Sequence, residues 1–186
     1  MSEQQQQEHS LVKIAMNLIL TCLVSGCIIG LVFFITGPTA KAKAEQMKEE
    51  SMRGLVPQAD TFTPVAGEKD TFVAEKGGKK IAYIIPTAPK GYGGPIKMLT
   101  AVSVDGIVLD YVALEANETP GLGDRGAKEP FKSQLKGKKV EGLEVTKDPN
   151  QKDKVQAMTG ATISSRAFTL GVKQAVEKAA TIGGKS

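Results

Sequence analysis

The chain has 186 residues and a formal net charge of +4, from 24 Lys and Arg against 20 Asp and Glu. It contains no Trp, has only 5% aromatic residues and disperses its lysines, which excludes the basic stripe and stacking platforms of a nucleic-acid-binding protein. Its only histidine, His9, and its two cysteines, Cys22 and Cys27, lie near the N-terminus. The rest of the chain therefore offers no disulfide, zinc site or thiolate-bound cluster, and acid–base chemistry there would need carboxylates, Lys or Tyr.

Residues 11–36 form one apolar stretch in which Lys13 is the single charged residue. A helix needs about 20 such residues to cross a bilayer, so the stretch predicts a transmembrane helix. Lys13 ahead of the apolar run resembles the start of a secretory signal, and residues 24–27 (Val-Ser-Gly-Cys) resemble a lipoprotein cleavage site. A cleaved signal has no need of the further apolar residues 28–35, so we expect an uncleaved anchor, with residues 1–10 as a cytoplasmic N-terminal tail.

Gly37-Pro38 ends the predicted span, and residues 39–53 are rich in Ala, Lys, Glu, Gln and Met, which favour a helix. Leu55-Val56-Pro57 interrupts this pattern. We expect residues 37–58 to form a juxtamembrane helix and linker, and residues 59–186 to form the exposed domain. More basic residues follow the span than precede it, so the positive-inside rule alone would put this domain in the cytoplasm.

The domain begins with a predicted loop, residues 59–69, followed by segments rich in β-branched and aromatic residues. Asp105-Gly106 separates two of these segments, and it is a strong short-range signal for a β-hairpin. Residues 164–180 repeat apolar side chains at helical spacing and predict a final helix. Together these elements indicate an α+β fold, an antiparallel sheet flanked by helices. The predicted strands are residues 71–75, 80–86, 98–104, 107–114, 142–146 and 155–158.

Two loops of the domain combine several glycines. Residues 90–96 place glycines around Tyr92, and residues 118–126 place glycines around Pro120 and Leu122. Glycine permits close approach of the backbone to a ligand, but it is also the ordinary residue of turns. Either loop alone therefore favours a turn.

The segment Thr159-Gly160-Ala161-Thr162-Ile163-Ser164 stands directly before the predicted final helix. Its small residues leave the hydroxyl of Thr162 open, and the unpaired N–H groups of a helix start favour a phosphate. In the alternative interpretation, Thr162 or Ser164 is only the N-cap of the helix.

Taken together, five features in this order resemble one family: the span, Gly-Tyr-Gly-Gly-Pro-Ile (91–96), the Asp-Gly hairpin, Glu-Thr-Pro-Gly-Leu-Gly (118–123) and Thr-Gly-Ala-Thr-Ile-Ser (159–164). The family is that of RnfG, the membrane-anchored FMN-binding subunit of the Rnf electron-transport complex. The chain is similar also to NqrC, the corresponding subunit of the sodium-pumping NADH:quinone oxidoreductase, which is usually longer. The resemblance implies an electron-carrying subunit of a complex that couples electron flow between reduced ferredoxin and NAD to sodium or proton transport.

The resemblance further implies that a flavin transferase joins FMN covalently, through its phosphate, to Thr162. Integral membrane subunits and other redox subunits of the same complex are the implied partners. Because the transferase acts outside the cytoplasm, the domain is expected to face the periplasm or cell exterior, against the positive-inside count. No catalytic residue and no metal are implied. The residues implied for the attachment site and the flavin ring are Thr159, Gly160, Ala161, Ile163, Ser164, Glu118, Thr119, Pro120, Gly121, Leu122, Gly123 and Tyr92.

Two positions depart from the family pattern: Gln156 stands where Asp is frequent, and Ala116 stands where many relatives carry His. Two other interpretations remain open beside the redox ones. The chain could be a membrane-anchored binding protein without redox activity, whose glycine loops hold a small ligand. It could also be an enzyme with a carboxylate pair among Glu115, Glu118 and Asp124, although acids in loops are usually solvated.

Overall fold

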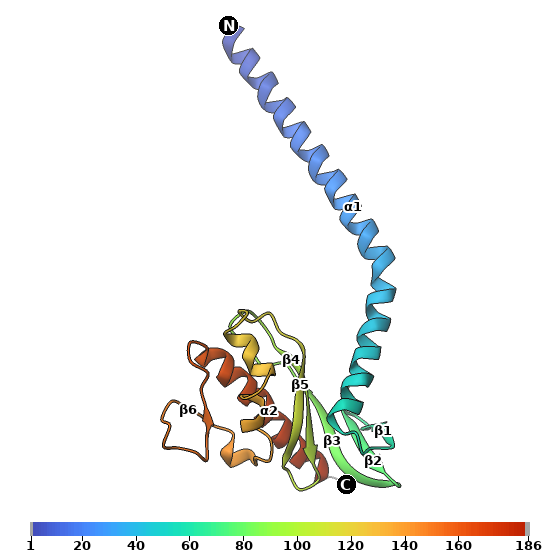
Figure 1. Cartoon of the computed structure of the whole chain (residues 1–186). Coiled ribbons are helices and arrows are strands. Elements are labelled where there is room, and N and C mark those ends of the chain that lie inside the picture. Colours follow the sequence, from blue (N-terminus) through green and yellow to red (C-terminus); the bar gives the residue numbers. More distant parts are fainter. Residues whose placement is uncertain (1, 185–186) are drawn as a thin grey trace. The chain divides into compact units, whose positions relative to one another are not determined.

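The computed structural model describes residues 2–184, with the backbone only for residues 2–10 and 41. The chain divides into two compact units, one ending at Gln46 and one beginning at Met47. The first unit is helical: α1 runs from Ser2 to Leu55, and its last turns belong to the second unit (Figure 1).

The apolar part of α1 is long and hydrophobic enough to cross a membrane. Its large side chains are exposed along the whole stretch, with Phe34 at 81%. Two hydroxyl groups are satisfied inside the helix, since Thr21 Oγ1 donates to the carbonyl of Asn17 at 2.5 Å and Thr36 Oγ1 donates to that of Val32 at 2.7 Å. An apolar helix whose polar groups bond internally is what a bilayer requires. The predicted apolar N-terminal helix is confirmed.

The helix does not stop where the apolar stretch ends. Pro38 lies inside α1 and removes one backbone N–H, yet the helix continues through the predicted segment 39–53 to Leu55. It ends shortly before Pro57, in agreement with the steric restriction that a proline places on the residue before it.

A five-stranded antiparallel sheet, with its strands in chain order, forms the centre of the second unit. The turn at Asp105-Gly106 joins two of its strands as predicted, and Gly106 takes a φ of +75° that favours glycine there. The predicted strands between residues 71 and 114 are confirmed to within two residues at each end. The strands are β1 (Thr61–Pro64), β2 (Phe72–Lys76), β3 (Lys79–Thr87), β4 (Lys97–Ser103) and β5 (Val108–Glu115).

Three elements differ from the sequence prediction. β1 lies within residues 59–69, where a loop was expected, and it pairs with β2 at the edge of the sheet, a position that tolerates Pro64. The last two strands are shorter than predicted: β6 (Val145–Thr146) and β7 (Val155–Gln156) pair in parallel over two residues each. Before β6 the chain forms the 3₁₀ turns η1 (Gly123–Ala127), η2 (Lys132–Gln134) and η3 (Val140–Gly142).

Helix α2 (Thr162–Gly183) covers one face of the sheet (Figure 1). The core on that face includes Tyr83, Ile85, Met98, Val102, Tyr111, Phe168, Val172, Ala175 and Val176. The opposite face packs against the end of α1 in a smaller core formed by Met52, Leu55, Val56, Ala74, Ala82, Ile84, Leu99 and Ala101. Both faces of the sheet are thus buried, and the predicted α+β class is confirmed.

Candidate functional site

A pocket of about 660 Å³ lies at the N-terminal end of α2. Its volume falls within the range of roughly 300–1,000 Å³ that is usual for small-molecule sites. Three segments far apart in the sequence meet there, together with one residue that follows β6. The lining residues are Tyr92, Thr119, Leu122, Gly123, Lys147, Gly160, Ala161, Thr162, Ile163 and Ser164.

The first turn of α2 presents its backbone to this pocket. Gly160 takes a φ of +78°, and the N–H of Ala161 donates to the carbonyl of Met158 at 3.0 Å, which closes a tight turn before the helix. Ser165 fixes this turn, because its Oγ accepts from the N–H of Met158 at 2.9 Å and donates to the carbonyl of Ala161 at 2.8 Å. Thr162 is the first helical residue, and no side chain caps the helix. The first N–H groups therefore stay available to an anion.

Glu118 connects the three motif segments. Its carboxylate is buried, with 7% of the residue exposed. Oε1 accepts a hydrogen bond from the N–H of Gly93 at 3.1 Å, and Oε2 accepts one from Oγ of Ser164. Ser164 is consequently bound to Glu118 and is not the N-cap that the alternative interpretation of the motif allowed.

Three of the motif glycines are required by close packing around this carboxylate and the peptide group before Glu118. A Cβ on Gly123 would lie 2.5 Å from Oγ of Ser164 and 2.6 Å from Oε2 of Glu118. A Cβ on Gly91 would overlap Oε1 of Glu118, and one on Gly93 would overlap the carbonyl oxygen of Asn117. Any larger residue at these positions would separate the segments that form the pocket.

Two basic side chains lie at the site, those of Arg125 and Lys147. The sequence motifs predicted neither of them. Arg125 donates through Nε to the carbonyl of Leu122 at 3.2 Å and through Nη2 to that of Thr159 at 2.8 Å, so it ties the loop before η1 to the segment before α2. Lys147 lines the pocket itself. It follows β6, whose parallel pairing with β7 sets its position, and no local sequence signal marks it.

Most of the predicted site residues line the pocket together. These are Tyr92, Thr119, Leu122, Gly123, Gly160, Ala161, Thr162, Ile163 and Ser164. Glu118, Pro120, Gly121 and Thr159 lie outside its lining. Glu118 nevertheless bonds to two of the segments that form the pocket, and the carbonyl of Thr159 is held by Arg125.

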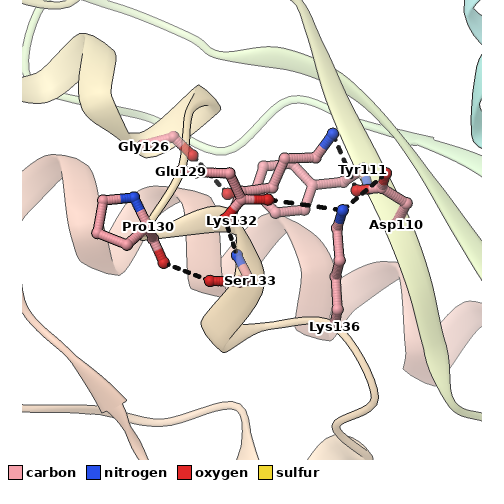
Figure 2. A network of polar contacts seen from close by, with 8 residues as sticks. All are labelled: Asp110, Tyr111, Gly126, Glu129, Pro130, Lys132, Ser133 and Lys136. Carbon is pink, nitrogen blue, oxygen red and sulfur yellow. Dashed lines mark hydrogen bonds and ion pairs between the residues drawn. The ribbon is translucent and has the colours of Figure 1, made fainter.

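A polar network fastens the segment after η1 to the sheet (Figure 2). Asp110 pairs with Lys132 at 2.9 Å and with Lys136 at 3.2 Å, and the hydroxyl of Tyr111 donates to the carbonyl of Gly126. Burial, with a smaller contribution from the nearby carboxylates, raises the pKa of Tyr111, so it stays protonated. Hydrogen bonds from Ser133 hold the pKa of Glu129 below its ordinary value. The bond to Gly126 thus holds η1, whose first residue, Gly123, lines the pocket.

The two acidic residues nearest to Glu118 in the sequence are each paired with a lysine. Glu115 pairs with Lys97 at 2.6 Å, and Asp124 pairs with Lys128 at 2.7 Å. The hydrogen bond from Lys128 lowers the pKa of Asp124. Among the side chains that the structure describes, no group of three His, Cys, Asp or Glu residues could hold a metal ion. Each acid close to Glu118 is thus engaged with its own lysine.

The pocket residues fit an FMN. Tyr92, Leu122 and Ile163 are 70%, 42% and 57% exposed, and they offer aromatic and apolar contact to a flat ring. The open N-terminus of α2 and the ammonium group of Lys147 offer positive potential to a phosphate. The hydroxyl of Thr162 lies in the same pocket as both.

Comparison with known proteins agrees with this geometry. Residues 91–177 match the family of the FMN-binding domain, a range that contains all three motif segments. The G subunit of the proton-translocating ferredoxin:NAD(+) oxidoreductase complex of Clostridium ljungdahlii is 49% identical over 179 residues, covering 96% of this chain and 97% of that protein. The G subunit of the Na(+)-translocating complex of Acetobacterium woodii is 27% identical, covering 89% of each chain.

Among solved structures, the C subunit of the Na(+)-translocating NADH-quinone reductase of Parabacteroides distasonis matches with a TM-score of 0.50 and 25% identity, over 61% of each chain. NqrC of Shewanella oneidensis shares the fold, with a TM-score of 0.51 and 21% identity over 70% of this chain and 72% of that one.

Proposed function

Because the chain belongs to the RnfG family, the G subunits of the ion-translocating ferredoxin:NAD(+) oxidoreductase complexes, we propose that it relays electrons through an FMN attached covalently, by its phosphate, to Thr162. As a member of this family it is an electron-carrying flavoprotein subunit of a membrane-bound complex of several subunits. When bound, FMN supplies the electron-transfer chemistry, and the protein supplies attachment, orientation and electrostatics.

The position of Thr162 carries the proposal. It is the first residue of α2, it lines the pocket, and its hydroxyl is not used as a helix cap. Gly160 and Ala161 leave the approach to it unobstructed, as a transferase would need. A phosphoryl group on this hydroxyl would meet the open N–H groups of the first turn and the charge of Lys147.

The other pocket residues would orient the ring. Leu122 and Ile163 would supply apolar contact and Tyr92 aromatic contact, while Arg125 holds the backbone on both sides of this wall. Covalent attachment prevents loss of the flavin from so open a site, which suits a carrier between fixed redox centres.

The remaining parts of the proposal concern the membrane. Residues 11–36 would cross it after a cytoplasmic tail of residues 1–10, and residues 37–58 would lead to the FMN-binding domain of residues 59–186. The span would dock against integral membrane subunits, and a flavin transferase would load the domain on the periplasmic or exterior side. We expect the exterior orientation despite the positive-inside count, because neighbouring subunits also determine the orientation of a span in a complex.

In-gel flavin fluorescence of the denatured protein tests the attachment. The full chain, co-expressed with a flavin transferase, should give a fluorescent band that Thr162→Ala abolishes and Thr162→Ser restores at least in part. Thr181→Ala is the matched control, since it removes an exposed threonine hydroxyl of the same helix outside the pocket lining, and it should keep the band. If the native chain gives no fluorescent band while another flavoprotein in the same cells is loaded, the result would contradict the proposal. It would favour the non-redox binding protein.

Cysteine labelling tests the sidedness. The domain has no cysteine of its own, so Asp105→Cys in the β4–β5 turn introduces one thiol into the domain at an exposed position. A membrane-impermeant maleimide should label it in intact cells. Labelling only after the cells are broken would place the domain in the cytoplasm and end this part of the proposal.

A further inference from the structure

Glu118 lies behind the pocket and not in its lining. It is almost fully buried, and each of its two carboxylate oxygens accepts a hydrogen bond, as an ionised carboxylate does. Within the part of the chain that the structure describes, no basic side chain forms an ion pair with it. Carboxylates are rarely buried without a cation, because removal from water disfavours the charge. The position therefore requires an explanation that packing alone does not supply.

The two hydrogen bonds join segments that lie far apart in the sequence. Gly93 directly follows Tyr92, which lines one part of the pocket, and Ser164 lies in the first turn of α2 together with Thr162. The backbone of Glu118 continues into Thr119, whose carbonyl accepts from the N–H groups of Leu122 at 3.1 Å and Gly123 at 3.0 Å. Glu118 thus links the three motif segments that line the pocket.

The glycines around Glu118 keep space for it on two sides. Gly91 and Gly123 belong to different motifs, and a Cβ at either position would collide with one of the two carboxylate oxygens. One glycine of each motif is consequently explained by the same buried side chain. Gly91 lies outside the pocket lining, so contact with a ligand does not explain it, whereas Gly123 lies both in the lining and against Glu118.

We propose that Glu118 is a positioning residue of the flavin site. Its carboxylate fixes the loop that carries Tyr92 relative to the helix turn that carries Thr162, and it places a negative charge behind the ring without contacting it. The inference rests on the proposed attachment of FMN to Thr162, and it adds a residue that determines how rigidly the flavin is held and at what potential it works.

The test uses the full-length, flavin-loaded protein in detergent, with four variants. Glu118→Gln keeps the shape but removes the charge and replaces one accepting oxygen by a donor. Ser164→Ala removes one of the two hydrogen bonds and leaves the charge in place. The double variant joins both changes. Glu115→Gln is the matched control, because it removes the same charge from an exposed side chain at the end of β5.

Three readouts are taken from each variant: in-gel fluorescence for loading, visible circular dichroism for the fixed orientation of the flavin, and the midpoint potential. All variants should keep the fluorescent band. Glu118→Gln should lose visible circular dichroism and shift the potential to more positive values, because an electron added to the flavin no longer meets a buried negative charge. Ser164→Ala should lose part of the dichroism with a smaller shift in potential, and Glu115→Gln should match the native protein.

The double variant shows whether the two residues act together. If Glu118 acts through Ser164, the double variant should lose no more dichroism than Glu118→Gln alone, whereas additive losses would overturn the inference. Unchanged dichroism and potential in Glu118→Gln would overturn it as well, since a purely structural residue would lower the unfolding midpoint and leave both signals intact. If Glu118→Gln does not fold, unchanged dichroism in Ser164→Ala decides against the inference. A native protein without a fluorescent band would instead contradict the proposed function.

Discussion

The two faces of the central sheet perform different tasks. The face covered by α2 holds the larger, aromatic core, and the helix that forms this core begins with Thr162 in the pocket. The face covered by the end of α1 holds a smaller aliphatic core with no residue in the pocket lining. We expect substitutions in the core under α2 to disturb the flavin site as well as stability. Substitutions in the core under the end of α1 should lower stability alone.

The largest effect is expected from Phe168→Ala on the α2 face. Phe168 is fully buried, and its ring centroid lies 6.1 Å from that of Tyr111 and 6.4 Å from that of Phe131. Removing a buried ring should lower the free energy of unfolding by about 3–5 kcal/mol. Denaturant unfolding measures this loss, and the visible circular dichroism of the loaded flavin should fall with it. A destabilised variant with native flavin dichroism would show that this core does not determine the geometry of the pocket.

Leu55→Ala makes the corresponding change on the α1 face. Leu55 is the last residue of α1 and is 7% exposed. Its truncation should lower the free energy of unfolding by about 2–3 kcal/mol, near the lower end for buried leucines. The dichroism of the flavin in the folded protein should stay native. Altered flavin dichroism in this variant would show that the two faces are coupled.

Alkaline unfolding should depend on Tyr111, on the α2 side. Burial raises its pKa above the ordinary 10.0, so above pH 10 the unfolded chain releases a proton that the folded chain keeps. This contribution to stability is complete below pH 10 and is lost as pH rises, at about 1.4 kcal/mol per pH unit. Urea titrations between pH 9 and 11 should show the slope, and Tyr111→Phe should reduce it. An equal slope in Tyr111→Phe would assign the effect to other groups.

The smallest effect is expected from Gly54→Ala in the last turn of α1. A Cβ at Gly54 would have no atom within 4 Å, and its backbone is helical. Alanine should therefore raise the free energy of unfolding by up to about 1 kcal/mol and leave the flavin unchanged. Gly106→Ala is the contrasting control, because a φ of +75° strains any side chain there and should destabilise the protein. Thermal unfolding midpoints would separate the two variants.

Local sequence signals were sufficient for elements with a strong pattern. The Asp105-Gly106 hairpin and the periodicity of residues 164–180 predicted a turn and a helix that the structure contains. The edge strand β1 escaped prediction because four residues ending in Pro64 carry too short a pattern, and pairing with β2 stabilises them. β1 therefore forms through its pairing with β2 and not through a strong local preference for a strand.

The pocket was predictable where a motif marked it, and not where distant segments meet. The hydroxyl of Thr162 and the glycines nearby stand in recognisable motifs, and the structure brings most of them together. Lys147 lies in a polar turn, and only the pairing of β6 with β7 carries it to the pocket. Glu118 was expected at the ring, whereas its bonds to Gly93 and Ser164 give it a place behind the pocket.

The order of segments along the chain has a consequence for biogenesis. Thr162 follows every strand of the sheet in the chain, and the helix that it begins packs over the β1–β5 sheet. A ribosome thus produces the attachment residue after the sheet that supports it. If loading requires this folded start, a flavin on Thr162 reports a completed domain, and chains that end before Thr162 carry no flavin.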